Sequence, residues 1–162
     1  FKCKDIIRSI NNFNLSKSDK NIQLSSFVRM LKDFYSQAIT SVNINFNYKS
    51  SLRIKIKYDD MLFHSIIHII DNAIDDSRST VEVSLYFDDQ NLIFEIQNDG
   101  RKFKKNILND KPKSKKDFGM GMGLYLSKII IERYQGSMDM DYANNTNYVK
   151  VFLPKKSIIF SK

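Results

Sequence analysis

GMGMGLYLSKIII, residues 119–131, places three glycines at alternate positions directly before an amphipathic helix. Glycine adopts backbone angles that other residues avoid, and it lets main-chain N–H groups approach a ligand closely. The first turn of a helix also presents unpaired N–H groups and the positive end of the helix dipole. Together these features predict a phosphate-binding site. A flexible surface loop uses glycines in the same way, and for this stretch alone it is an equally good explanation.

The glycines of the chain are concentrated around one segment. The sequence has only five, and four of them flank or fill residues 100–121 or the start of the helix that follows. This segment is basic, polar and without hydrophobic periodicity, which predicts a long loop. The spacing of apolar residues then predicts a helix over residues 122–134, ended by Gln135-Gly136 as its C-cap.

A second polar feature lies in the helix predicted over residues 59–78. In HSIIHIIDNAIDDS (64–77), His68 and Asn72 are four residues apart and therefore share one side of the helix. An amide oxygen is a hard, neutral ligand of the kind that Mg²⁺ accepts together with phosphate and water. Three aspartates of the same segment, Asp71, Asp75 and Asp76, are expected to crowd around Asn72. The alternative is an ordinary helix whose polar side faces solvent.

A third feature ends a hydrophobic strand in a polar turn, IQNDGRKF (96–103). A side-chain oxygen at the end of a strand can accept a hydrogen bond from the amino group of adenine, and Gly100 would leave room for the base. Taken alone, Asn98-Asp99-Gly100 is ordinary turn chemistry.

The remaining elements follow from hydrophobic spacing, and their order indicates the fold class. A helix is expected after Ser25-Ser26, which form a plausible N-cap pair. Apolar and polar residues alternate in segments 42–48 and 52–58, which predicts a hairpin turned at Lys49-Ser50-Ser51. The expected strands are residues 22–24, 42–48, 52–58, 80–87, 92–96, 138–142 and 148–153, after a helix end at 1–13. Helices mixed with antiparallel strand pairs predict a two-layer α/β sandwich with helices on one face of the sheet.

In this order and spacing, the three segments resemble the GHKL ATPases, the superfamily of gyrase, Hsp90, MutL and the histidine kinases. HIIDNAIDDS resembles the N-box, and NDGRK falls where the D-x-G-x-G G1 box belongs. Residues 119–140 are similar to the histidine kinase G2 box with the helix and strand after it. The resemblance covers residues 22–154. It implies a Bergerat-type fold, with a mixed, largely antiparallel sheet, and transfer of the γ-phosphate of ATP to a protein histidine.

The resemblance also implies roles for individual residues. Asn72 would coordinate the Mg²⁺ that bridges the phosphates, Asn98 would receive the adenine amino group, and residues 101–118 would form a mobile lid. The expected nucleotide-binding residues are Asn72, Asp75, Asn98, Gly100, Phe103, Gly119, Met120, Gly121, Met122, Gly123 and Leu124. Lys115 and Lys116, with Lys113, are candidate lid cations, although exposed lysines in a loop are more often simply solvated. Phe103 or Phe118 would close over the base.

Three positions depart from the family pattern. Asn98 replaces the usual Asp, which gives a weaker, uncharged acceptor. Lys102 replaces the second glycine of the G1 box and would bring bulk and charge near the pocket unless it points outward. His68 stands where kinases usually have Asn and gyrase-like ATPases have a catalytic Glu. Neutral histidine is a poor Mg²⁺ ligand, so His68 is expected to be a packed or supporting polar residue, with a general-base role as the alternative.

Composition excludes several other classes of protein. With 162 residues and 42% hydrophobic content, the chain can form one domain with a core. The single cysteine, Cys3, excludes an intrachain disulfide framework and fits a cytoplasmic location. The net charge of +8 is not accompanied by any nucleic-acid-binding motif, so no nucleic-acid partner is expected. No apolar run is long enough to cross a membrane, and no membrane insertion is expected.

The predicted organisation has three parts. Residues 1–20 would be the end of a dimerisation helix with its linker, 21–156 the catalytic domain, and 157–162 a tail. Neither His64 nor His68 lies in a phosphoacceptor-like setting. The phosphorylated histidine is therefore expected on a dimerisation domain outside this chain, with a response regulator as downstream partner. The alternatives are a degenerate GHKL interaction module, which Asn98 and Lys102 favour, and a gyrase-like ATPase switch, which His68 disfavours.

Overall fold

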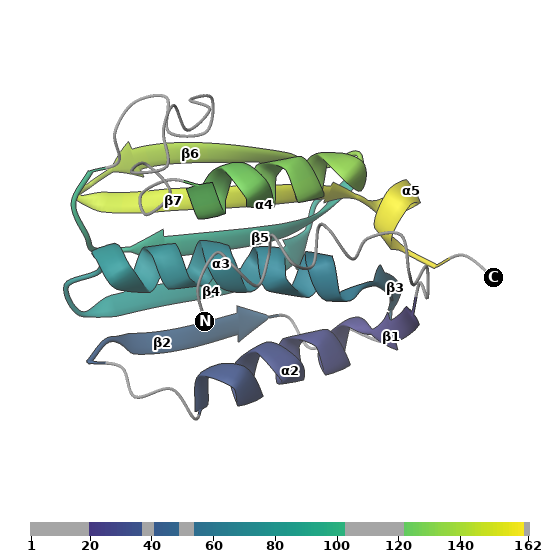
Figure 1. Ribbon diagram of the computed structural model, residues 1–162, viewed down its shortest axis with the longest axis horizontal. Helices are drawn as coiled ribbons and strands as arrows, with labels where there is room; N and C mark the ends of the chain where they lie inside the picture. Colours follow the sequence, from purple (N-terminus) through teal and green to yellow (C-terminus); the bar gives the residue numbers. More distant parts are fainter. Residues whose placement is uncertain (1–19, 37–40, 49–53, 103–121, 161–162) are drawn as a thin grey trace.

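Helices and a sheet form two layers in the computed structural model of the chain (Figure 1). The structure describes residues 20–36, 41–48, 54–102 and 122–160. In chain order, the elements are β1 (Lys20–Gln23), α2 (Leu24–Ser36), β2 (Asn43–Tyr48), β3 (Lys55–Tyr58), α3 (Asp60–Asp76), β4 (Thr80–Phe87), β5 (Asn91–Asn98), α4 (Met122–Arg133), β6 (Ser137–Ala143), β7 (Thr146–Pro154) and α5 (Lys155–Ile158). The predicted two-layer α/β architecture is confirmed.

The main sheet of the described residues has the strand order β2-β4-β5-β7-β6. The pair β2–β4 is parallel and the other three pairs are antiparallel, as expected for a mixed, largely antiparallel sheet. The predicted hairpin of residues 42–48 and 52–58 is wrong. The first of these segments is β2, and the second contributes β3, which pairs antiparallel with β1 in a separate small sheet. Alternation of apolar residues indicates which side chains are buried, but it does not specify the neighbouring strand.

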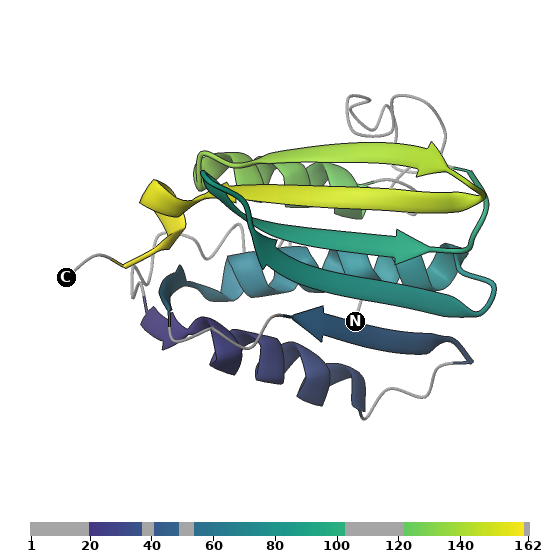
Figure 2. The ribbon, with the colours of Figure 1, turned by 180° about the vertical axis from the view of Figure 1, so that it is seen from behind.

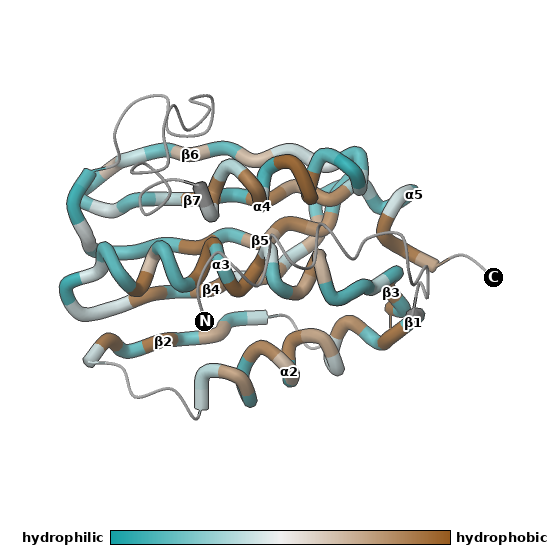
Figure 3. The backbone as a smooth tube through the Cα atoms, in the orientation of Figure 1, coloured by the Kyte–Doolittle hydropathy of each residue, from teal (hydrophilic) through white to brown (hydrophobic). Residues whose placement is uncertain are grey.

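Apolar side chains of the helices and the sheet meet in one core. In Figure 3, hydrophobic and hydrophilic residues alternate along α3, as expected of a helix that packs one face against a core. Ile66 and Ile70 of α3 are fully buried, as are Val83 of β4 and Phe94 of β5. The helix begins after Asp59, whose side chain accepts a hydrogen bond from the Leu62 amide at 2.7 Å. This N-cap fixes the start of the helix that carries the candidate site.

Helix α2 begins one residue earlier than its predicted N-cap pair, Ser25-Ser26. Its first residue, Leu24, is fully buried, and the Leu24 amide donates to the carbonyl oxygen of Ile54 at 2.9 Å. That bond satisfies one of the N–H groups that a helix start leaves unpaired. Burial of Leu24 at the junction with β1 therefore decides where the helix starts, and the serines fall inside its first turn.

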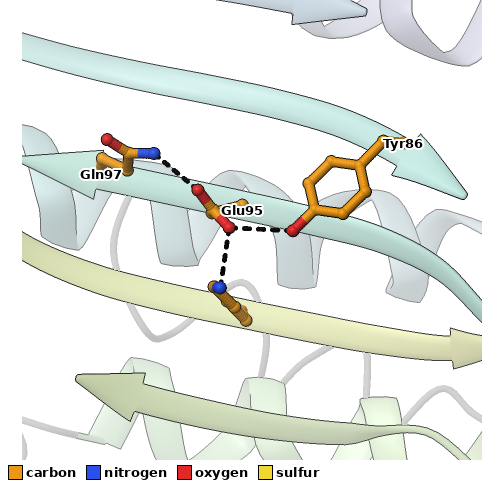
Figure 4. Close-up of polar contacts among 4 residues, drawn as sticks. Tyr86, Glu95 and Gln97 are labelled. Carbon is orange, nitrogen blue, oxygen red and sulfur yellow. Dashed lines mark hydrogen bonds and ion pairs between the residues drawn. The ribbon is translucent and has the colours of Figure 1, made fainter. Parts of the chain in front are cut away.

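The other face of the sheet points away from the helices (Figure 2). At its centre, Glu95 accepts hydrogen bonds from Tyr86 Oη at 2.9 Å and Gln97 Nε2 at 2.6 Å, and it pairs with Lys150 Nζ at 3.0 Å (Figure 4). Partial burial raises the pKa of Glu95, but these three partners together bring it below its ordinary value. The cross-strand network stabilises a face that no helix covers in Figure 2.

The C-terminal end adds an element that hydrophobic spacing did not predict. The expected tail, 157–162, begins inside α5, where Ile158 is fully buried. The next residue, Ile159, forms an antiparallel bridge with Ile56 of β3. This segment therefore connects the small β1–β3 sheet to the main body. In the described part of the chain, no helix is long and apolar enough to cross a membrane.

Candidate functional site between helix α3, strand β5 and the start of helix α4

The side chain of Asn72 lies beside the first turn of α4. Its Nδ2 donates to the carbonyl oxygen of His68, one turn earlier in α3, at 2.6 Å. This bond fixes the amide plane and leaves the side-chain oxygen, the atom that a cation would need, outside that contact. A Cβ added to Gly123 would lie 3.3 Å from Asn72 Nδ2. The structure thus brings together two segments that are some fifty residues apart, and glycine keeps the space between them open.

Small side chains allow α3 and α4 to pack closely below this point. Ser127 is 1% exposed, and its hydroxyl donates to the carbonyl oxygen of Ser65 at 3.2 Å. Leu124, three residues earlier, is also buried. Figure 1 shows the two helices on the same face of the sheet. The contact fixes the position of the first turn of α4, with its N–H groups, relative to Asn72.

Asn98 forms the second part of the site, at the end of β5. The burial pattern of β5 places Asn98 on the same face as Phe94 and Ile96, the face that packs against the helices. The side chain is 2% exposed, and its Nδ2 has no hydrogen-bond partner among the described residues. An unpaired buried N–H typically costs about 1–3 kcal/mol. Such a group is therefore a candidate contact for a bound ligand.

Gly100 allows the turn after β5 to touch the end of α3. A Cβ at this position would lie 1.9 Å from the carbonyl oxygen of Asp76 and 2.5 Å from Asn98 Nδ2. No residue larger than glycine fits without a backbone shift. The space beside Gly100 is therefore filled by the protein itself, and the glycine acts through this close approach of β5 to α3.

Asp99 is a residue whose importance the sequence did not reveal. Its carboxylate accepts hydrogen bonds from the hydroxyls of Ser77 and Ser79, both at 2.6 Å, and from the amides of Arg78 at 2.9 Å and Ser79 at 3.1 Å. The Ser77 bond, followed by those from Ser79, holds the pKa of Asp99 far below its usual range. Asp99 thereby ties the α3–β4 connection to the end of β5. Its only sequence signal was that Asp is common in turns.

Asp71 belongs to a different contact. Tyr35 Oη on α2 donates to Asp71 Oδ1 at 2.7 Å, so this carboxylate is engaged with α2. The expectation that Asp71 crowds around Asn72 is therefore wrong, because adjacent residues of a helix point about 100° apart. Burial raises the pKa of Asp71. Burial also lowers the pKa of the half-buried His68, so its imidazole is neutral at about pH 7.

The other predicted residues divide into two groups. Asp75 is exposed and lies three residues after Asn72. Lys102 is exposed, with its Nζ 5.1 Å from the centre of the Tyr142 ring on β6, which is the outward orientation that the sequence left open. Outside the described residues lie Phe103, Lys113, Lys115, Lys116, Phe118, Gly119, Met120 and Gly121. Met122 begins α4, but its side chain is also outside them.

Another buried amide lies next to Asn98. Asn147 of β7 is its register neighbour, is fully buried, and donates through Nδ2 to the carbonyl oxygen of Arg101 at 2.8 Å. No sequence pattern pointed to this residue, because nothing local distinguishes it from other polar residues at strand ends. Within the described ranges, His, Cys, Asp and Glu side chains form no cluster of three that could hold a metal. Amide groups and the start of α4 therefore dominate the site.

Comparison with known proteins places this fold and site in a family. Residues 57–157 match the family of histidine kinase-, DNA gyrase B- and HSP90-like ATPases, and the chain belongs to this family. Among curated proteins, it is similar to the sensor protein KdpD of Clostridium acetobutylicum, with 27% identity. That match covers 83% of this chain but 17% of the relative, so the chain spans a small part of that protein's length.

Solved structures show the same fold in histidine kinases. The catalytic domain of the histidine kinase ThkA aligns with a TM-score of 0.69 and 17% identity, over 84% of this chain and 95% of that one. The histidine kinase AdeS of Acinetobacter baumannii aligns with a TM-score of 0.66 and 18% identity, over 93% of this chain and 74% of that one. At these identities the similarity concerns the fold.

Proposed function

We propose that the chain is the ATP-binding catalytic domain of a two-component sensor histidine kinase. It would transfer the γ-phosphate of ATP to a histidine on a dimerisation domain. The observation that carries this proposal is the meeting of Asn72 with the first turn of α4. The side-chain oxygen of Asn72, which could hold a metal ion, thus belongs to a residue beside a helix start that could hold phosphate. Family membership and the kinase relatives support the same reading.

The residues of the site fit magnesium nucleotide. Asn72 has its amide nitrogen engaged with His68, and its oxygen would hold the ion next to the phosphates. The N–H groups of the first turn of α4 would bind phosphate oxygens, with Gly123 leaving the space beside Asn72 open. The buried Asn98 would contact the base. When bound, Mg²⁺ would neutralise charge on the phosphates during transfer.

His68 would act as a positioning residue. Its carbonyl oxygen holds the Asn72 amide, and its ring is kept neutral by burial. A neutral imidazole is a poor ligand for Mg²⁺ compared with an oxygen donor. Asp75 would contribute to the nucleotide pocket, and Lys115 and Lys116 would act as lid cations. We further propose that residues 1–20 belong to a dimerisation helix with its linker, that 21–156 form the catalytic domain of a cytoplasmic enzyme, and that a response regulator receives the phosphoryl group.

The second candidate is a GHKL domain that no longer binds nucleotide and serves only as a protein-interaction module. The replacement of the usual Asp by Asn98 favours it. The orientation of Lys102 toward Tyr142 weakens it, because that lysine does not have to occupy the pocket. The two candidates differ directly in nucleotide binding.

Calorimetric titration with ADP and a non-hydrolysable ATP analogue, with and without Mg²⁺, tests the proposal. We expect Mg²⁺-dependent binding that Asn72→Ala weakens by about tenfold or more, the loss typical of a disrupted metal site. Asn45→Ala, on the exposed side of β2, is the matched control and should leave the affinity unchanged. Folded protein that binds neither nucleotide would support the interaction module instead.

Phosphoryl transfer needs its own measurement. The chain would be incubated with γ-labelled ATP, Mg²⁺ and the separately produced dimerisation domain of the same kinase. Label on a histidine of that domain, lost with Asn72→Ala, would support the kinase activity. Nucleotide binding without any transfer would restrict the proposal to an ATP-binding domain.

A further inference from the structure

Asn98 replaces a carboxylate with an amide at the end of β5, and this change bears on which base the site accepts. Resting on the proposed nucleotide-binding function, we propose that Asn98 lets the pocket bind 6-oxopurine nucleotides, such as those of hypoxanthine and guanine, about as well as adenine nucleotides. The residue would then determine base specificity. Its side chain would face the 6-position of the purine and the ring nitrogen beside it.

The position of Asn98 carries this inference. The side chain lies on the helix-covered face of the sheet, is 2% exposed, and keeps an unpartnered Nδ2 among the described residues. A Cβ on Gly100 would lie 2.5 Å from the same nitrogen, so the main chain of this turn passes close to it. The neighbouring amide of Asn147 uses its own Nδ2 to bind the Arg101 carbonyl. The Asn98 nitrogen is thus a buried donor that still needs an acceptor.

The chemistry of the two side chains differs in one decisive respect. An ionised carboxylate only accepts hydrogen bonds. At the 6-position it therefore pairs with the amino group of adenine and repels the carbonyl oxygen of a 6-oxopurine, which offers it only the neighbouring N1–H. An amide has a donor and an acceptor side by side. It can accept from the adenine amino group while donating to N1. Rotated by half a turn, it can donate to a 6-oxo group while accepting from N1–H.

The unpaired donor gains an acceptor in either arrangement. A buried N–H without a partner is destabilising, and either N1 of adenine or the carbonyl oxygen of a 6-oxopurine would satisfy it. A carboxylate at this position would gain a charge-assisted bond to adenine and lose the ability to bind the oxo group. The Asn98 pocket should therefore discriminate weakly between the two classes of purine, whereas an aspartate pocket should discriminate strongly.

Parallel calorimetric titrations with ADP and IDP in the presence of Mg²⁺ test this. IDP carries a 6-oxo group where ADP has an amino group, with the accompanying change at N1. We expect the wild-type affinities to agree within about fivefold, the size of one ordinary net hydrogen bond. In Asn98→Asp, ADP should be preferred by about tenfold or more, because a buried polar group facing the wrong partner is strongly rejected.

Asn145→Asp is the matched control. It makes the same chemical change in the exposed β6–β7 turn, and it should leave the ADP/IDP ratio at its wild-type value. A similar shift in both variants would show that added negative charge, and not the group facing the base, changes the preference, and would overturn the inference. If Asn98→Asp fails to fold, the ratio of the ADP and IDP affinities of the wild type still tests the inference.

The outcomes separate this inference from the function on which it rests. If the wild type binds ADP but rejects IDP by more than about tenfold, the specificity role of Asn98 is wrong and the ATP-binding proposal stands. If the wild type binds neither nucleotide, both proposals fail. If ADP and IDP bind comparably to the wild type but only ADP binds well to Asn98→Asp, the specificity role is supported.

Discussion

At the scale of single residues, Asp99 makes contacts that hold the β5 end of the site in place. Because its folded-state pKa is far below the ordinary value of 3.8, its contribution is complete above that value and is lost as the pH falls below it. We expect Asp99→Asn to lower the free energy of unfolding by about 1 kcal/mol at neutral pH, a modest value because the site is partly exposed. The difference in the free energy of unfolding between this variant and wild type should shrink toward about pH 3. Urea unfolding of both proteins, from neutral pH down to that pH, measures this difference.

Asp139→Asn, on an exposed position of β6, provides the comparison for this experiment. It removes an aspartate without touching the turn, and its unfolding curve should follow that of wild type at each pH. A stability difference for Asp99→Asn that stays constant from neutral to acidic pH would show that its hydrogen bonds do not depend on ionisation of the carboxylate.

At the scale of elements, Gly100 and Gly123 lie where β5 and α4 approach α3, and the two positions should differ in how well they tolerate an added methyl group. We expect Gly100→Ala to destabilise the protein by about 1–3 kcal/mol, because the added methyl would lie 1.9 Å from the Asp76 carbonyl oxygen and the backbone would have to move. Gly123→Ala would place a methyl 3.3 Å from Asn72 Nδ2, a tight but tolerable contact. Alanine is also more favourable than glycine within a helix by about 1 kcal/mol. Thermal melting should therefore show a loss for the first variant and none for the second.

Nucleotide titration distinguishes the two glycine variants further. Gly123→Ala should keep its stability and still bind magnesium nucleotide more weakly, because its methyl would enter the space between Asn72 and α4. Equal melting temperatures for both variants would mean that the contact between Gly100 and α3 relaxes more easily than its geometry indicates.

At the scale of the whole molecule, the C-terminal segment connects the two sheets. Ile158 is fully buried, and the Phe160 amide donates to the Lys55 carbonyl oxygen on β3 at 3.0 Å. We expect Ile158→Ala to lower the free energy of unfolding by about 2–4 kcal/mol, the cost of a cavity in a core. Chemical denaturation at neutral pH measures the change. The element is thus part of the folded unit and not a dispensable tail.

Phe160→Ala is the matched control for that prediction. Its side chain is 41% exposed, and its main-chain bond to β3 does not depend on the ring. Its truncation should therefore cost clearly less than that of Ile158. Equal losses for the two variants would indicate that packing of the aromatic ring, and not the buried isoleucine, holds this segment.

The sequence was informative about the site where chemistry is local. Asn72 was recognisable because a polar residue within an apolar helix is unusual, and Gly123 because it lies in a glycine-rich stretch at the start of a strong helix. The structure adds what brings them together, a 3.3 Å approach across the α3–α4 contact. The Asp71–Tyr35 bond and the pairing of Asn98 with Asn147 could not be predicted, because each joins residues at least 36 positions apart in the chain.

Local sequence patterns were sufficient to predict the helices α3 and α4, the strands β4 and β5 and the two-layer class, because periodicity, capping and turn chemistry act between near neighbours. The parallel pairing of β2 with β4 and the pairing of β3 with β1 became clear only from the folded structure. The same is true of the place of α5 in the core. Strand partners and burial depend on which surfaces meet after the chain has folded, and an alternating apolar pattern is compatible with several neighbours.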